Sequence, residues 1–174
     1  MPSNAPPKRF FLENLNRFCA LMRLASRFYH ANPLNEHVRL EVTSADVLKV
    51  LSSLNAHHVQ YLIVDGLACV FYGYIRTSVD LTLWVRSTSK NKENLLASLD
   101  HFTENGLKLN LLEDLYGFKQ ADFDQCYTRA IIGSLDNVPF NLIALGDLIQ
   151  DKQASKRRQD LTDAEALSRI TPSY

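Results

Sequence analysis

The sequence is poor in cysteine, the residue that builds disulfide frameworks and many zinc sites, with only 3 among 174 residues. Cys19, Cys69 and Cys126 are odd in number, far apart and outside any Cys-x-x-Cys spacing. A cross-linked scaffold and a cysteine zinc site are therefore not predicted. Cys69 has no histidine close to it in sequence, which favours a buried thiol over a nucleophile. A reducing cytoplasm is the simplest location for such a chain.

Long hydrophobic runs are also missing. No uninterrupted apolar segment reaches the roughly 18 residues that a membrane-spanning helix needs. The N-terminal stretch lacks the continuous apolar centre of a signal peptide. We therefore expect no membrane partner.

A charge of one sign is absent as well, since 19 lysines and arginines balance 19 acidic residues. A uniformly basic surface for nucleic acid is therefore not supported, and a local basic arm is the alternative. The balance hides a gradient, because the first 40 residues are net basic and the remainder is net acidic. The basic residues of this segment are Lys8, Arg9, Arg17, Arg23, Arg27 and Arg39, against Glu13 and Glu36.

Residues 1–40 are interpreted as an N-terminal extension, and 41–174 as the main domain. Residues 1–8 are proline-rich and predicted to be disordered. From residue 9 to 30 an apolar residue recurs every three or four positions, which predicts an amphipathic helix. Its arginines fall off the apolar face. They are typical of a helix that packs on the main domain with solvated charges, and the alternative is a helix that binds a partner or nucleic acid.

The main domain is organised around residues 59–85. The pattern predicts a buried strand over 59–64, a tight turn at Asp65-Gly66, a short apolar helix reaching Gly73, and a second strand over 79–85. A helix capped by Thr43 or Ser44 precedes this unit. A helix beginning at 87–89 and ending near 105–106 follows it, and then a strand over 107–112.

The second half of the domain reads as a hairpin followed by helices. A turn is predicted over 114–121 and a short irregular piece around 123–127. Strands are predicted over 128–133 and 138–143, joined through 134–137, and residues 145–170 are predicted to be helical with a break at 156–159. The apolar residues expected to face the core in these helices are Leu148, Ile149, Ala154, Leu161, Ala164 and Leu167. This order of elements predicts an α/β (α+β) domain in which helices cover a small mixed sheet.

The central unit places an aspartate on the strand after a glycine turn and a short helix. Asp65-Gly66 forms the turn, Arg76-Thr77 precedes the strand, and Asp80-Leu81-Thr82 begins it. This arrangement resembles the nucleotidyltransferase fold of the DNA polymerase β superfamily. Within it, the chain is most similar to the minimal nucleotidyltransferases and the AbiEii-type toxins of toxin–antitoxin systems.

A second stretch, residues 138–167, is similar to the later strand and C-terminal helices of that family. The resemblance implies a Lys, an Arg and an Asp-x-x-Asp motif, matched by Lys152, Arg157, Asp160 and Asp163. It implies transfer of a nucleoside monophosphate from a nucleoside triphosphate to RNA or protein, with Mg²⁺ held by carboxylates on adjoining strands. The positions implied to contact the nucleotide are Asp65, Gly66, Arg76, Thr77, Lys152 and Arg157.

The sequence departs from the family where the chemistry lies. Asp80 is implied as the metal ligand, but Thr82 replaces the second carboxylate. Asn141 replaces the third if residues 140–143 match the family's strand, with Asn110 the weaker candidate. Asp65 stands where the family has the first glycine of its turn, so its charge would repel a triphosphate.

These departures predict a degenerate metal site at Asp80, Thr82 and Asn141, with impaired or absent catalysis and only weak Mg²⁺ binding. The chain would then be a regulatory or binding module. The alternative is an active transferase that uses Asp80 and Asp65 as metal ligands. A third hypothesis makes the N-terminal helix a surface for a second copy or an antitoxin partner.

Overall fold

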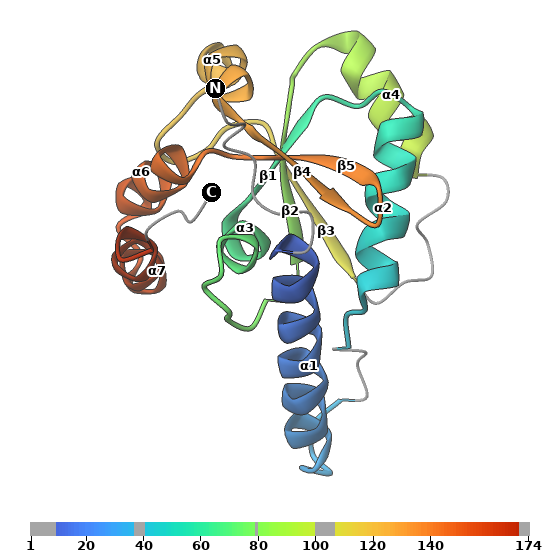
Figure 1. Ribbon diagram of the computed structural model, residues 1–174, viewed down its shortest axis with the longest axis vertical. Helices are drawn as coiled ribbons and strands as arrows, with labels where there is room; N and C mark the ends of the chain where they lie inside the picture. The colour runs from blue at the N-terminus through green and yellow to red at the C-terminus, as the bar shows by residue number, and fades with distance from the viewer. Residues whose placement is uncertain (1–9, 37–40, 79, 100–106, 171–174) are drawn as a thin grey trace.

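A computed structural model describes residues 10–36, 41–78, 80–99 and 107–170 (Figure 1). These residues form seven α-helices, one short 3-10 helix and a five-stranded mixed sheet. The fold is therefore of the mixed α/β class, with a helix at the N-terminal end. Residues 1–8 and the helix end predicted at 105–106 lie outside the described residues. Among the described helices, none has the length and apolarity needed to cross a lipid bilayer.

The first half of the described chain follows the predicted order of elements. In chain order these are α1 (Phe10–His30), α2 (Ser44–Ala56), β1 (Tyr61–Val64), α3 (Asp65–Phe71), β2 (Asp80–Val85), α4 (Ser89–Leu99) and β3 (Lys108–Leu112). The predicted cap of α2 is confirmed, because Thr43 Oγ1 accepts a hydrogen bond from the Asp46 backbone N–H at 3.2 Å. The Asp46 carboxylate in turn accepts the Thr43 N–H at 2.9 Å, which completes a capping box.

The second half differs from its prediction at two places. Its elements are η1 (Gln120–Asp122), α5 (Phe123–Arg129), β4 (Ile131–Leu135), β5 (Val138–Leu142), α6 (Leu145–Ser155) and α7 (Arg158–Ser168). The piece at 123–127 is helical, not irregular, so the hairpin begins at Ile131 instead of Thr128. The hairpin turn is only Asp136-Asn137, with φ values of 45° and 67°. Two residues of positive φ match the twist of the strands, so no longer loop is needed.

The sheet has the strand order β3-β2-β1-β5-β4. β1 is antiparallel to β2 and parallel to β5, β2 is parallel to β3, and β4 is antiparallel to β5. Figure 1 shows α2 and α4 on one side of this sheet and α3, α6 and α7 on the other. β1 is the middle strand, and all four of its residues are buried. The turn that follows β1 is consequently held by the most buried part of the sheet.

The core joins α1 to the rest of the domain. The Phe71 and Phe140 rings stack with centroids 4.8 Å apart, and the Phe11 ring meets both of them edge-on. Asn14 Nδ2 also donates a hydrogen bond to the Phe71 carbonyl, at 3.2 Å. The side chain of Trp84, predicted to be a core residue, is fully buried. The apolar face of α1 is thus part of the same hydrophobic core as α3 and β5.

The buried face of α6 and α7 is more polar than predicted. Leu148, Ala164 and Leu167 are buried as expected, but Ala154 and Leu161 are exposed. Their expected places are taken by charged residues, because Asp151, Lys152, Asp160 and Asp163 are buried instead. The prediction from apolar periodicity was wrong about which residues of this face are buried. Buried charges that neutralise one another leave no trace in a hydrophobic pattern.

Candidate functional site

The centre of the candidate site is a buried lysine ammonium. Lys152 of α6 is 2% exposed, and its Nζ lies 2.5 Å from Asp65 Oδ1, 2.7 Å from Asp160 Oδ1 and 3.0 Å from Asp163 Oδ2. Removal of a charged group from water is costly unless it is paired and hydrogen-bonded. Three carboxylates meet this requirement for Lys152.

Two arginines extend the cluster. Arg76 Nη1 lies 2.9 Å from Asp163 Oδ2, and Arg157 Nε lies 2.6 Å from Asp160 Oδ2. Three cationic side chains therefore face three carboxylates, and their formal charges sum to zero. We refer to these six residues as the Lys152 network: Asp65, Arg76, Lys152, Arg157, Asp160 and Asp163.

Local structure explains how the network forms. Asp160 and Asp163 are three residues apart on α7, so both project from one helix face. α6 ends at Lys156, which adopts the left-handed conformation with φ 58°, and this lets α7 return beside α6. Asp65, at the start of α3, also has a left-handed backbone, with φ 57°. Glycine is favoured in that conformation and aspartate tolerates it, which is consistent with an aspartate at a glycine-type turn.

Electrostatics keep the buried members of the network charged. Burial alone would lower the pKa of Lys152, but the charge of Asp65 and hydrogen bonds to Asp160 and Asp65 raise it above its ordinary value. Burial alone would raise the pKa of Asp160, but hydrogen bonds and charge from Lys152, with hydrogen bonds from Ser155 and Arg157, lower it below its ordinary value. Lys152 and Asp160 therefore form an ion pair at neutral pH.

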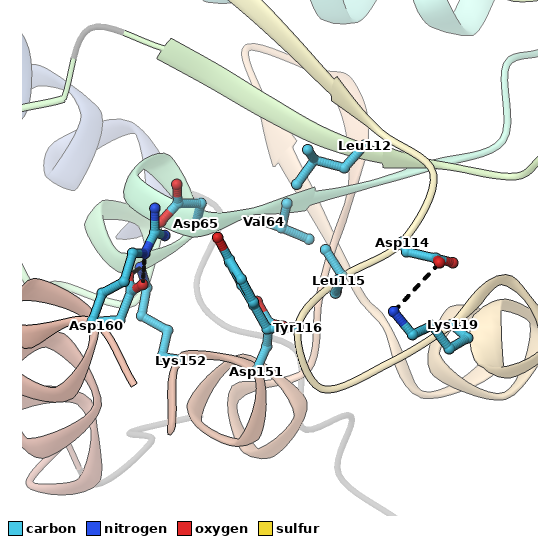
Figure 2. A pocket seen from close by; sticks show the side chains of 11 residues that line it. Val64, Asp65, Leu112, Asp114, Leu115, Tyr116, Lys119, Asp151, Lys152 and Asp160 are labelled. Carbon is cyan, nitrogen blue, oxygen red and sulfur yellow. Dashed lines mark hydrogen bonds and ion pairs between the residues drawn. The ribbon is translucent and has the colours of Figure 1, made fainter. Parts of the chain in front are cut away.

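A cavity of about 370 Å³ lies beside the network. Figure 2 shows Asp65, Lys152 and Asp160 on one side of it and the Lys119–Asp114 ion pair on the other, with the Tyr116 ring between them. The Arg157 guanidinium lies over the Tyr116 ring, 5.1 Å from its centroid. The remaining lining consists of the apolar side chains of Val64, Leu112 and Leu115 and the carboxylate of Asp151. The cavity thus combines three cations and four carboxylates with an aromatic ring and an apolar wall. Apolar and aromatic lining with a few polar groups is typical of ligand sites.

A second cavity, of about 350 Å³, shares Asp65 with the first. It is lined by Asp65, Arg76, Thr77, Ser78 and Asp80. Asp80 Oδ1 is buried and accepts no hydrogen bond from the described residues, and Lys108 Nζ lies 3.9 Å from it. Four predicted site residues, Asp65, Arg76, Thr77 and Asp80, are brought together here.

The strand register decides which residues share a face with Asp80. Thr82 is paired with Val64 on one side and with Asn110 of β3 on the other. Directly opposed residues point to the same face of a sheet. Asn141 lies on β5, which β1 separates from β2, and it is paired with Ile132. Asn110, the weaker candidate from the sequence, is therefore the residue adjacent to Thr82.

The three carboxylates of the network are close enough to hold a cation. One oxygen from each of Asp65, Asp160 and Asp163 lies within 4.8 Å of the others. Lys152 Nζ, however, is within 3.0 Å of all three and occupies that space. A divalent ion would have to displace the ammonium and would leave it buried without a partner. These residues therefore do not fit a magnesium ion while Lys152 is in place.

Two further predicted residues have structural roles. Gly66 lies so close to the loop before β2 that an added Cβ would be 2.6 Å from Ser78 Oγ. A side chain at position 66 would therefore push this loop away. Cys69 is buried, and burial raises the pKa of its thiol to about 12, which agrees with a thiol that is not a nucleophile.

Two features of the site were not found from the sequence. Tyr116 lies in a segment that was interpreted only as a turn, and the sequence holds no signal for its position in the cavity. Asp160 and Asp163 matched a family motif but were not assigned to the site. Their spacing of three residues on a helix, opposite a lysine, was the available signal.

Comparison of the chain with protein-family models, with curated proteins and with solved structures finds no match.

Proposed function

We propose that this chain is a nucleotidyltransferase-like module that binds a nucleotide and whose capacity for nucleotidyl transfer is impaired. The single observation that supports this most directly is the register of β2 and β3. Asp80 is the only carboxylate among the described residues of β2 and β3, and the polar side chains that share its face are Lys108, Thr82 and Asn110. The chain keeps a phosphate-sized cavity beside cationic groups while its metal ligands are depleted.

The charge balance explains why catalysis would be impaired. Two-metal transfer needs carboxylates that hold two divalent ions a few ångströms apart. Mg²⁺ prefers anionic oxygen ligands in octahedral geometry. Asp80 offers one negative charge against the four positive charges of two divalent ions. The oxygens of Thr82 and Asn110 are neutral and add no negative charge. Asp65 cannot add its charge while it is paired with Lys152 at 2.5 Å.

Nucleotide binding is supported by the composition of the 370 Å³ cavity. Lys152 and Arg157 are candidates for phosphate contacts, because guanidinium and ammonium groups bind phosphate oxygens. Tyr116 and its apolar neighbours suit a planar base. The aromatic ring, the apolar wall and the cations lie within one cavity, so one nucleotide could contact all three.

The test uses the purified chain and α-³²P-labelled nucleoside triphosphates, with Mg²⁺ or Mn²⁺ and total RNA. We expect weak nucleotide binding by calorimetry that added Mg²⁺ does not strengthen, and no label on RNA or protein. Tyr116→Ala should weaken binding, and Tyr74→Ala, a change outside the cavity lining, serves as a matched control. Metal-dependent label that disappears in Asp80→Ala would contradict the proposal.

A second candidate function is active metal-dependent transfer through a rearranged site. It is favoured by one observation: Asp80 Oδ1 is buried with no hydrogen-bond donor among the described residues, and Asp80 lines the same 350 Å³ cavity as Asp65. An ion between these carboxylates would give Asp80 Oδ1 a partner, and Asp65 would have to leave Lys152 to bind it. Mn²⁺ titration followed by electron paramagnetic resonance tests this candidate, since it requires binding that both Asp80→Asn and Asp65→Asn remove.

A protein partner on α1 is a third proposal, supported by the exposed side of that helix. Leu24 and Phe28 are 50% and 73% exposed. They lie four residues apart on one stripe, beside the exposed arginines Arg17, Arg23 and Arg27. An acidic antitoxin-like segment or a second copy would cover this stripe.

Deletion of the extension is not a suitable test of that surface, because Phe11 and Leu15 belong to the core. Leu24→Ser with Phe28→Ser leaves the buried face intact. If the parent self-associates through this stripe, sedimentation should show a smaller assembly for the double variant than for the parent. If another protein binds there, it should co-purify with the parent and not with the double variant. Unchanged assembly and unchanged co-purification in the double variant would count against the proposal.

A further inference from the structure

Asp65 differs in exposure from the other two carboxylates of the Lys152 network. Its side chain is 39% exposed, whereas those of Asp160 and Asp163 are 5% and 0% exposed. Asp160 and Asp163 each accept hydrogen bonds from two further side chains. Among the described residues, Lys152 is the only partner of the Asp65 carboxylate. Asp65 is therefore the carboxylate that can leave the network with the fewest lost contacts.

Departure of Asp65 would leave the network with unbalanced charge. Three cations would face the two remaining carboxylates, with a formal excess of one positive charge at a lysine that is 2% exposed. A buried cation without full compensation attracts an anion from solution. Lys152, Arg157 and Asp65 all line the 370 Å³ cavity, so an anionic ligand has direct access to that position.

The other carboxylates of the cavity already have partners of their own. Asp114 Oδ2 lies 3.4 Å from Lys119 Nζ on the far side (Figure 2). Asp151 Oδ1 accepts a hydrogen bond from the Gly117 backbone N–H at 2.9 Å. The position beside Lys152 is therefore held by Asp65, which makes it the group that a ligand must replace.

We propose that Asp65 is an internal anion that closes a phosphate site. In this mechanism a phosphate of the ligand replaces the Asp65 carboxylate at Lys152 and is bound by Lys152 and Arg157 without a metal ion, while Asp65 turns toward solvent. The inference rests on the proposed function, because it describes how the same site is kept closed. The ligand class is a phosphate or diphosphate group, as in a nucleotide.

The test measures inorganic pyrophosphate binding in EDTA by calorimetry. Asp65→Asn retains the shape of the side chain and the tolerance of positive φ while it removes the charge. Asp65→Gly also accommodates the backbone and removes the side chain. We expect both variants to bind pyrophosphate about tenfold or more tightly than the parent, the effect of one regained charge-assisted hydrogen bond.

Asp114→Asn is the matched control, because it removes the same charge from the same cavity without releasing Lys152. Its ion pair is exposed and screened by solvent, so we expect a change of about twofold or less. Folding of each variant is checked by amide NMR spectra. Folded Asp65 variants that bind no more tightly than the parent overturn the inference, and so does equal tightening in Asp114→Asn.

Binding of nucleoside triphosphates, measured by the same calorimetry in EDTA, distinguishes this inference from the proposed function. Tighter pyrophosphate binding in the Asp65 variants, without additional affinity from a nucleoside, supports the closed phosphate site and contradicts a nucleotide-binding role. Nucleotide binding that is equally strong in the parent and in Asp65→Asn supports the role and contradicts closure by Asp65.

Discussion

Thr82 on β2 lies directly opposite Asn110 on β3, so two neutral side chains are adjacent on the sheet face that begins with Asp80. This pairing identifies the positions at which carboxylates would rebuild a metal site. It also shows which asparagine is adjacent to Thr82, because β1 separates β2 from Asn141.

The first prediction concerns this pair. Thr82→Asp combined with Asn110→Asp should create Mn²⁺ binding, because Asp80 would then have two carboxylate neighbours. At a metal concentration about 100 times the dissociation constant, the variant should gain about 2.7 kcal/mol of stability. Thermal unfolding with and without Mn²⁺ measures this gain. Thr82→Asp with Asn141→Asp adds the same charge and should gain little, so an equal gain would contradict the register argument.

The second prediction concerns the buried ammonium. Lys152→Met would leave Asp160 and Asp163 short of their central cation, and breaking a buried ion pair typically costs about 3–5 kcal/mol. We expect a loss of that size in the free energy of unfolding measured in urea. Lys119→Met removes a lysine whose side chain is 67% exposed and should cost less than about 1 kcal/mol. A loss in Lys152→Met as small as the one expected for Lys119→Met would show that the network adds no stability.

The third prediction is the acid sensitivity of the fold. Because the folded-state pKa of Asp160 is below its ordinary value, its contribution is present above the unfolded pKa and is lost as the pH falls through the folded pKa. The unfolded value is about 3.9, so the loss should occur below about pH 4. Unfolding free energies between pH 6 and pH 2 should therefore fall less steeply for Asp160→Asn than for the parent. Parallel curves would contradict this assignment.

The fourth prediction separates the two sides of α1. Phe18 is 2% exposed and Phe28 is 73% exposed. Phe18→Ala should cost about 3–5 kcal/mol because it leaves a cavity in the core. Phe28→Ala should change stability by about 0.5 kcal/mol or less. Denaturant unfolding of both variants measures the contrast, and a large loss for Phe28→Ala would show that this side of the helix is packed.

The fifth prediction concerns the close approach of α3 to the loop before β2. In Gly66→Ala the new Cβ would lie 2.6 Å from Ser78 Oγ and 2.9 Å from Ser78 Cβ, so one of the segments must move. We expect destabilisation of about 1–3 kcal/mol, typical of overpacking. Ser78→Gly should restore part of the loss in the double variant, because it removes both clashing atoms. A double variant no more stable than Gly66→Ala would exclude this contact as the cause.

The sequence by itself determined the order of the elements and the local features within them. The periodicity of α1, the Thr43 cap and the apolar β1 each depend on residues that are neighbours in the chain. Such signals depend on side-chain period and turn chemistry, so they can be read without the fold. The short α5 was missed because seven residues are too few to show a clear helical period.

Only the tertiary structure decided the composition of the site. Lys152 and Asp65 are 87 residues apart, and the contact between them requires α3 and α6 to pack together. The choice between Asn110 and Asn141 depends on the order β3-β2-β1-β5-β4, which the alternation of elements leaves open. The burial of Lys152, Asp160 and Asp163 could not be predicted from the sequence either. Charged side chains are buried stably only when partners neutralise them, and these partners come from distant segments of the chain.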